Sequence, residues 1–168
     1  MAALVAVQAA LSERPGALSV ARALSHFGEH SIGWVAVAAV GAVLSPKRRR
    51  DWLLAGAGAF AAHAAAVIVK RIVRRKRPHD PAVVVNVGTP SKLSFPSAHA
   101  TSTTAAAVLM GRTTGLPLPA VLVPPMALSR MLLGVHYPSD VAFGIALGAV
   151  VAAIARRAGE VARGEPHE

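Results

Sequence analysis

The stretch Ser129–Asp140, SRMLLGVHYPSD, brings a cation, an imidazole and a carboxylate close together in the sequence. Pro138 suits the first position of a helix, which would put His136 just before the helix and Asp140 in its first turn. A carboxylate there can accept the proton of one imidazole nitrogen and leave the other free to attack. Arg130 can direct a planar set of donors at a phosphate held nearby. The stretch therefore predicts a phosphate site with a histidine nucleophile; a helix hinge with a satisfied histidine is the alternative.

Two further cations, Lys70 and Arg77, stand shortly before Pro78. Their spacing is about two helical turns, so we expect both side chains on one side of a helix that ends at Pro78. An ammonium point charge and a bidentate guanidinium suit a phosphate. The other basic residues of this run are expected to form a solvated collar that faces lipid headgroups: Arg71, Arg74, Arg75 and Lys76.

A third cluster, Pro96-Ser97-Ala98-His99, opens the apolar segment that follows. The unpaired N–H groups and partial positive charge of a helix N-terminus can hold phosphate oxygens. Ser97 can add a hydroxyl donor, and His99 is placed to protonate a leaving oxygen. A simple helix cap also explains this cluster.

The segments that must position these residues are apolar and helical. The first segment is interrupted by SERPG, which predicts an amphipathic or interfacial pair of helices. The second segment is too short to span a bilayer by itself, so the span must include residues that flank it. We expect an all-α, multi-pass transmembrane bundle of about six helices, with the three clusters on one membrane face. The segments are Met1 to Phe27, Ser31 to Ser45, Trp52 to Val69, Pro96 to Arg112, Leu116 to Leu133 and Pro138 to Ile154.

The composition agrees with one membrane-embedded domain over residues 1–168, with its motif core at 70–140. Hydrophobic residues make up 54% of the chain and charged residues only 15%, against roughly 25% charged residues in soluble domains. Without cysteine, disulfides and thiolate metal sites are excluded. A net charge of +10 favours acidic partners such as anionic headgroups or phosphorylated substrates. Nucleic acid is disfavoured, because the arginines lie at the ends of apolar segments and aromatic residues make up only 4%.

The three clusters resemble, in order and internal spacing, the signature motifs of the type 2 phosphatidic acid phosphatase family. The resemblance covers residues 70–140, and the flanking segments fit the family's helix bundle. The sequence departs from the family at Ala98, where glycine is usual; a methyl group there leaves the helix N-terminus in place. The matching positions are Lys70, Arg77 and Pro78, then Pro96, Ser97 and His99, then Ser129, Arg130, His136 and Asp140.

This resemblance implies a role for each motif residue. His136 would be the nucleophile that forms a phosphohistidine, Asp140 would orient it, and His99 would be the general acid that later activates water. Because cations and helix-end amides can supply the charge stabilisation, we expect no metal and no other cofactor. The phosphoryl oxygens would be bound and neutralised by Lys70, Arg77, Ser97 and Arg130.

Longer stretches resemble an actinobacterial branch of the family: SHFGEHSIGWVAVA, NVGTPSKLSFPSAHATSTTAAAVL and PPMALSR. Members of that branch remove the 5-phosphate from a polyprenyl-linked phosphoribose, a step toward the arabinose donor for arabinogalactan and lipoarabinomannan. The resemblance implies a hydrolase that acts on a lipid-linked phosphosugar in cell-wall biogenesis. A polyprenyl diphosphate or phosphatidate-type phosphatase with the same site is the alternative within the family. A non-catalytic basic membrane scaffold is the alternative outside it.

Some candidate residues lie outside the motifs. Glu29 and His30 precede the second apolar segment, at the end that faces the motif loops. With His26 they are candidates for a sugar pocket that binds ribose hydroxyls; an interfacial helix cap is the alternative. His63 lies in the middle of the third segment, where an ionisable residue is a functional candidate. A neutral imidazole bonded to a neighbouring helix also explains it.

From residue 47 onward, the lysines and arginines are divided evenly, with eight on the motif face and eight on the opposite face. Setting aside the cations assigned to phosphate leaves an excess on the opposite face, which favours an extracytoplasmic site under the positive-inside rule. We therefore expect a multi-pass protein of the cell membrane, whose partners are membrane lipids and a polyprenyl-linked phosphosugar.

Overall fold

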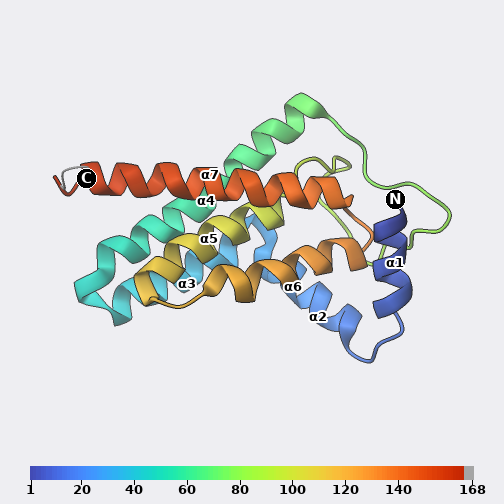
Figure 1. Cartoon of the computed structure of the whole chain (residues 1–168), viewed down its shortest axis with the longest axis horizontal. Coiled ribbons are helices and arrows are strands. Elements are labelled where there is room, and N and C mark those ends of the chain that lie inside the picture. Colours follow the sequence, from blue (N-terminus) through green and yellow to red (C-terminus); the bar gives the residue numbers. More distant parts are fainter. Residues whose placement is uncertain (165–168) are drawn as a thin grey trace.

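The structure is a computed structural model that describes residues 1–164, so the last four residues of the predicted domain lie outside the described part. The prediction of an all-α bundle is confirmed for this part of the chain (Figure 1). Short 3₁₀ turns, Glu29–Ser31 and Pro46–Arg48, connect α2 to α3 and α3 to α4. The helices are α1 (Ala2–Leu11), α2 (Ala17–Gly28), α3 (Ile32–Leu44), α4 (Arg49–Val73), α5 (Ala98–Thr114), α6 (Leu118–Leu132) and α7 (Pro138–Val161).

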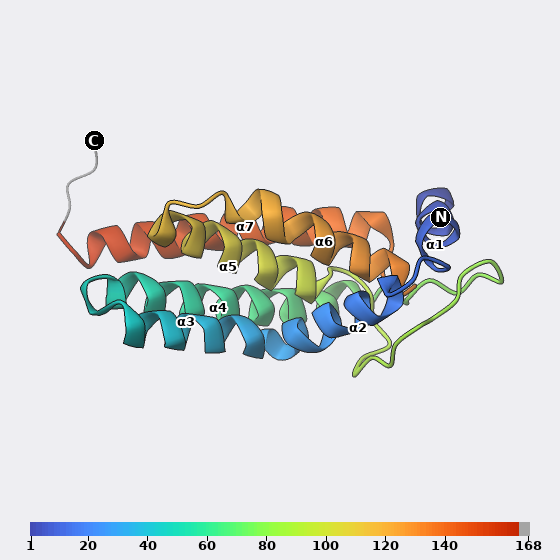
Figure 2. The ribbon, with the colours of Figure 1, turned by 90° about the horizontal axis from the view of Figure 1, so that it is seen from below.

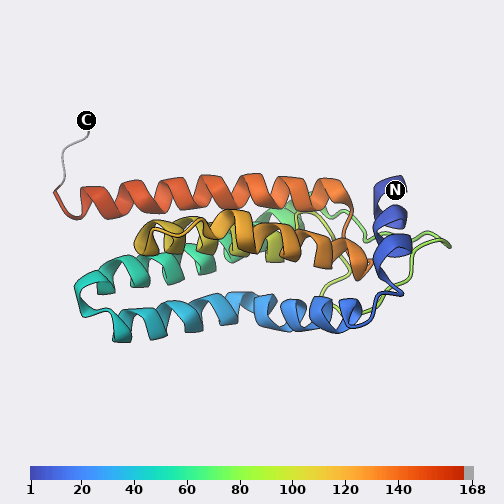
Figure 3. The same cartoon turned by 60° about the horizontal axis from the view of Figure 1, so that its bottom comes forward.

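Among residues 1–164, three helical units are long and apolar enough to cross a membrane: Ala17–Leu44, Pro46–Val73 and Pro138–Val161. The first of them joins α2 to α3, because α3 alone has only 13 residues and a span needs about 20. The prediction that the second segment borrows its flanks is thus confirmed. The first segment, predicted as an amphipathic or interfacial pair of helices, forms α1 and α2, and α2 belongs to the apolar unit that it makes with α3. In the described part of the chain, α1 lies across the end of the bundle (Figure 3).

Helix α5 lies at the centre of the bundle, between α4, α6 and α7 (Figure 2). Almost every residue of α5 is buried, including a run of serine, threonine and alanine. Small residues let neighbouring helix backbones approach closely in a membrane protein. At Gly148 of α7, an added Cβ would collide with the backbone oxygen of Thr101 in α5. Trp34 of α3 donates a hydrogen bond to Thr103 of α5 at 3.1 Å.

The bundle has two chemically different ends. The connection between α4 and α5, the connection between α6 and α7, and α1 lie at one end (Figure 1). The turn between α3 and α4, the turn between α5 and α6, and the end of α7 lie at the other. The three polar clusters therefore share one end, as the sequence predicts.

Candidate active site

His136, in the connection between α6 and α7, lies beside the carboxylate of Asp140 in the first turn of α7. Tyr137 is the N-cap of α7 and Pro138 its first residue, as predicted, and the Asp140 Oδ2 accepts the Tyr137 backbone N–H at 2.8 Å. The same Oδ2 lies 3.6 Å from Nδ1 of His136. Within residues 1–164, this Nδ1 has no hydrogen-bond partner. The carboxylate therefore fixes the loop by capping it and faces the imidazole from behind.

The other nitrogen of His136 faces the cavity that the site residues line. Its Nε2 lies 3.4 Å from Arg77 Nη1, and the side chain is otherwise buried. Burial lowers the pKa of His136 well below its ordinary value of 6.5, and the positive charges of Arg130, Arg77 and Lys70 lower it further. The imidazole is therefore neutral at physiological pH, which is the form in which nitrogen has a free lone pair.

Arg77 reaches the site by a route that differs from the predicted one. Helix α4 ends at Val73 and Arg74 has φ 54°, so Lys70 and Arg77 do not share a helix face. The chain turns instead, and Arg77 donates to the Ser91 carbonyl at 2.9 Å and to the Val135 carbonyl at 2.7 Å. Burial lowers the pKa of Arg77 to about 10, which leaves the group charged at neutral pH.

Lys70 and Arg130 complete the set of cations around His136. Lys70 is 8% exposed and Arg130 is 1% exposed, and both line the cavity. Nε and Nη1 of Arg130 are buried without a hydrogen-bond partner in the described part of the chain. Because leaving buried donors unpaired costs about 1–3 kcal/mol each, this guanidinium indicates a site built to receive an anion.

The third cluster, Pro96-Ser97-Ala98-His99, lies at the beginning of α5 as predicted. Its serine and its histidine have different surroundings. Ser97 is the N-cap of α5; its hydroxyl accepts the Ala100 N–H at 3.4 Å and is fully buried. Ser97 does not line the cavity, so its position matches the helix-cap alternative better than direct phosphate contact. His99 does line the cavity, and its Nε2 lies 2.9 Å from the Ser25 carbonyl oxygen of α2. Since a carbonyl only accepts, this nitrogen carries the proton.

The cavity itself has a volume of about 670 Å³ and is bordered by α2, α4, α5 and the connection between α4 and α5. Its polar part contains His136, His99 and the three cations. Its other part is apolar, with Phe60, Val67 and Ile68 of α4 among the lining residues. A cavity of this size with one cationic and one apolar part suits a phosphorylated lipid.

The predicted sugar-pocket residues lie in the same cavity. His26, Glu29 and His30 all line it, and His26 Nδ1 is 4.0 Å from a Glu29 carboxylate oxygen. His30 and Ser31 have φ 50° and 63°, so the backbone bends sharply between α2 and α3. His63 also lines the cavity, with its ring 5.6 Å from that of His30. Its buried Nδ1 has no partner within residues 1–164, so the predicted bond to a neighbouring helix is not found at this nitrogen.

Comparison with known proteins places this geometry in a family. The sequence profile of the PAP2 superfamily matches residues 51–162. The chain belongs to the PAP2 superfamily. It is 73% identical over 154 residues to the decaprenylphosphoryl-5-phosphoribose phosphatase of Mycobacterium tuberculosis H37Rv, covering 92% of this chain and 87% of the relative. It is 73% identical to the protein of that name from Mycolicibacterium smegmatis, covering 85% and 79%.

Solved structures of PAP2 proteins share the fold. A transmembrane PAP2 type phosphatidylglycerolphosphate phosphatase from Bacillus subtilis superposes with a TM-score of 0.70 at 23% identity, covering 95% of this chain and 85% of the other. LpxE from Aquifex aeolicus superposes with a TM-score of 0.65 at 20% identity, covering 92% of both chains. The protein is therefore a PAP2 membrane bundle.

One residue of this PAP2 site was assigned to the wrong environment by the sequence prediction. Arg75, expected in the headgroup-facing collar, turns inward and binds Asp140 Oδ1 at 3.0 Å and Ser139 Oγ at 2.9 Å. Its guanidinium also stacks over the Tyr137 ring, 4.0 Å from the centroid. Arg75 thus clamps the beginning of α7 beside His136. Its position depends on the turn after Val73, which no local pattern in the sequence indicates.

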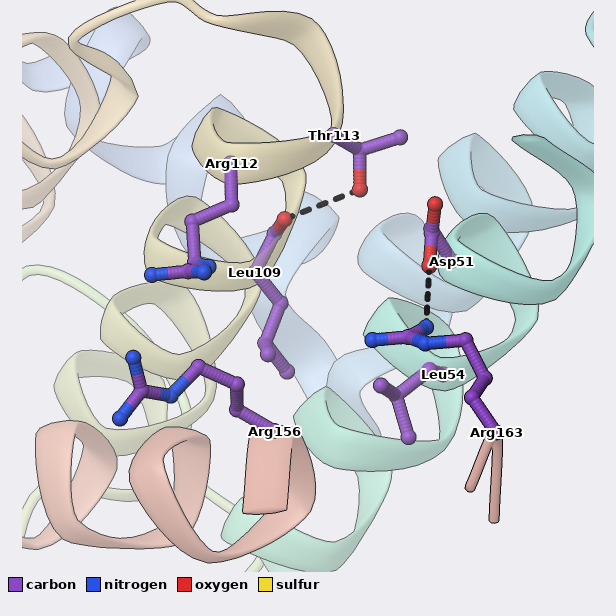
Figure 4. A pocket seen from close by; sticks show the side chains of 7 residues that line it. All are labelled: Asp51, Leu54, Leu109, Arg112, Thr113, Arg156 and Arg163. Atoms are coloured by element: carbon purple, nitrogen blue, oxygen red, sulfur yellow. Dashed lines mark hydrogen bonds and ion pairs between the residues drawn. The ribbon is translucent and has the colours of Figure 1, made fainter. Parts of the chain in front are cut away.

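The opposite end of the PAP2 bundle has a smaller hollow of about 170 Å³. Its lining includes Arg112 of α5, Arg156 of α7 and Arg163, which follows α7 (Figure 4). Arg163 pairs with Asp51 at 3.0 Å. This hollow has no histidine among its lining residues. Nowhere within residues 1–164 do three His, Asp or Glu side chains come together to hold a metal ion.

Proposed function

We propose that the protein removes the 5-phosphate from a polyprenylphosphoryl-5-phosphoribose through a phosphohistidine intermediate, as a step toward arabinan precursors of the cell wall. The single observation that carries the chemistry is a neutral imidazole, His136, whose Nε2 borders a cavity among three cations. The observation that supports the substrate is the 73% identity to phosphatases named for it. The apolar wall of the cavity fits the prenyl chain.

In the first step, His136 Nε2 attacks phosphorus as the bond to the ribose 5-oxygen breaks. His99, doubly protonated when the phosphate dianion is bound, gives its Nε2 proton to that oxygen and becomes neutral, so its bond to the Ser25 carbonyl must be exchanged for one to the substrate. Lys70, Arg77 and Arg130 hold the phosphoryl oxygens and neutralise charge as it develops. The sugar leaves as an alcohol and phosphate stays on His136. Cations in these places can supply the stabilisation that a metal supplies elsewhere.

In the second step, His99 takes a proton from water, and the oxygen of that water attacks the phosphohistidine. The phosphorus–nitrogen bond breaks, which returns His136 to its neutral state and releases inorganic phosphate. Asp140 faces Nδ1 of His136 and stabilises the positive charge that the ring has while it is phosphorylated. Arg75 keeps that carboxylate in place.

The ribose lies beside the bend between α2 and α3. Glu29 and His30, together with His26, border the cavity there and can bind the ring hydroxyls. Ser97 acts through the helix N-terminus, which its hydroxyl caps, and not by direct contact with the phosphate.

The active site faces the extracytoplasmic side of the membrane. Once Lys70, Arg77 and Arg130 are set aside as parts of the cavity, the remaining basic residues are slightly more numerous at the opposite end, even with Arg14 and Arg22 counted at the site end. The positive-inside rule then puts the opposite end in the cytoplasm. The basic residues there are Lys47, Arg48, Arg49, Arg50, Arg112, Arg156, Arg157 and Arg163.

The proposal is tested by phosphate release from purified protein in detergent with a chelator present. A prenylphosphoryl-5-phosphoribose, a prenyl diphosphate and phosphatidate are compared for the wild type and for His136→Ala. We expect strong preference for the phosphoribose lipid and loss of turnover in the variant by at least about a thousandfold, because the nucleophile is absent.

Preference for another lipid would overturn the proposed substrate and leave the histidine mechanism standing. Equal turnover by the wild type and His136→Ala would overturn the mechanism. Trapping of ³²P on the wild-type protein in acid-labile, base-stable form, absent from His136→Ala, distinguishes a phosphohistidine from direct attack by water.

A further inference from the structure

Helix α4 forms one wall of the cavity with two adjacent stripes of side chains. His63, Val67 and Lys70 follow one another at helical spacing on the inner stripe, which leads toward His136. Lys70 is nearly buried. This stripe therefore leads from the apolar part of the cavity, at Val67, to its polar part, at Lys70.

The outer stripe of α4 borders the cavity as well, and it also faces the lipid. It consists of Phe60, Ala64, Ile68 and Arg71, again at helical spacing. Phe60 is 59% exposed and Ile68 is 60% exposed, although both line the cavity. A chain that leaves the cavity over this stripe would stay on apolar surface until it reaches the membrane.

Arg71 stands at the end of the outer stripe that lies nearest the phosphate site, one residue from Lys70. Within residues 1–164 it has neither a hydrogen-bond nor an ion-pair partner, whereas Arg75 pairs with Asp140 and Arg77 donates to two carbonyls. An unpaired guanidinium beside an apolar surface suits an anion that lies at the boundary between polar and apolar regions.

The proposed substrate has such an anion. It carries the 5-phosphate that is removed and, on the other side of the ribose, a phosphodiester that joins the sugar to the prenyl chain. If the 5-phosphate lies at His136 and the chain lies on the outer stripe, the phosphodiester falls between them. We propose that Arg71 binds this phosphodiester and so selects lipids that have a second phosphoryl group beyond the one removed.

This assignment rests on the proposed function, and it gives Arg71 a role in specificity. Phosphatidate has a single phosphate, which would occupy the site at His136 and leave Arg71 unpaired. A guanidinium can donate two parallel hydrogen bonds to the free oxygens of a phosphodiester. Losing them should weaken binding of the phosphoribose lipid and leave the chemical step unchanged.

The test compares Arg71→Gln with Arg74→Gln. Arg74 has the same charge, lies three residues further along and is exposed, but it does not line the cavity. Substrates are a short-chain prenylphosphoryl-5-phosphoribose and phosphatidate, with ribose 5-phosphate as a monoester lacking both lipid and diester. For Arg71→Gln we expect KM for the phosphoribose lipid to rise about tenfold with kcat unchanged, and no change for the other substrates. Arg74→Gln should resemble the wild type throughout.

An unchanged KM for the phosphoribose lipid in Arg71→Gln overturns the assignment. So does an equal loss on phosphatidate, which would mean that Arg71 attracts anionic lipids in general. In both cases the wild type still prefers the phosphoribose lipid, so the proposed function survives. A wild type that hydrolyses phosphatidate but not the phosphoribose lipid overturns both, which separates the two failures.

Discussion

Buried polar atoms without a protein partner gather around the cavity. Within residues 1–164 they include two nitrogens of Arg130, Nδ1 of His136 and Nδ1 of His63. Leaving such an atom unpaired costs about 1–3 kcal/mol, so the site gives up stability for the ability to bind a substrate that pairs with these groups. The cations also act on His136, the proposed nucleophile, because their charges oppose its protonation.

The protonation of His136 gives a prediction about pH. Its pKa lies well below 6.5 because burial and three neighbouring cations disfavour the imidazolium. Because of this low pKa, the ring stays neutral as the pH falls through 6.5. Protonation of His136 should therefore not lower kcat/KM near pH 6.5, and should lower it only at more acidic pH. In ¹⁵N spectra of histidine-labelled protein, the signal that His136→Ala removes should stay in the neutral form at pH 6. A signal that titrates at or above 6.5 would contradict the electrostatics.

The positions of some site residues can be predicted from the sequence, and those of others cannot. The positions of His136 and Asp140 follow from one local pattern, a helix that begins at Pro138, and the structure has that helix. Arg130 lies in the last turn of the preceding helix, as its place near the end of an apolar segment predicts. Arg75 depends on a turn with positive φ after α4, which brings it beside a helix far along the chain. The sequence is enough to place Arg71 on the apolar face of its helix, because Ala64, Ile68 and Arg71 follow the spacing of one helix face.

At the scale of elements, α2 positions His99, the proposed general acid. The Ser25 carbonyl of α2 binds His99 Nε2 at 2.9 Å, and Gly28 leaves room for the ring: a Cβ there would lie 2.7 Å from His99 Cδ2. The sequence predicts an amphipathic or interfacial pair of helices here, since the apolar pattern is broken at SERPG and gives no sign that α2 joins α3 through a turn. The contact between the Ser25 carbonyl and His99 depends on this connection of α2 to α3.

We predict that Gly28→Ala lowers kcat by about tenfold or more by displacing His99, because small misplacements of catalytic groups are costly. The fold should be kept, since alanine is favourable in a helix. Gly148→Ala is the matched change in α7, where the new methyl would meet the Thr101 backbone and should destabilise the packing of α5 on α7 by about 1–3 kcal/mol. Steady-state kinetics and thermal midpoints in detergent separate the two effects. Full kcat in Gly28→Ala would show that α2 does not set the position of His99.

At the scale of the whole molecule, periodicity and charge were enough to predict a helix bundle with all three motifs at one end. They could not predict the cavity, because its walls come from α2, α4, α5 and a long connection that has no regular structure. The two ends differ in a way that matters for orientation: one has the cavity, and the other has the arginines around Asp51. In the proposed orientation, arginines at that end can interact with anionic headgroups of the cytoplasmic leaflet.

The orientation can be measured directly because the chain has no cysteine, so a single introduced thiol is the only label site. Val85, in the connection between α4 and α5, is 57% exposed at the cavity end, and Leu116, in the turn between α5 and α6, is 57% exposed at the basic end. Neither substitution by cysteine changes the charge on which the positive-inside argument depends. A membrane-impermeant maleimide should label Val85→Cys in right-side-out vesicles and Leu116→Cys only in inverted ones. The reverse pattern would put the phosphatase site in the cytoplasm, where phosphoribose lipids would have to be processed before they cross the membrane.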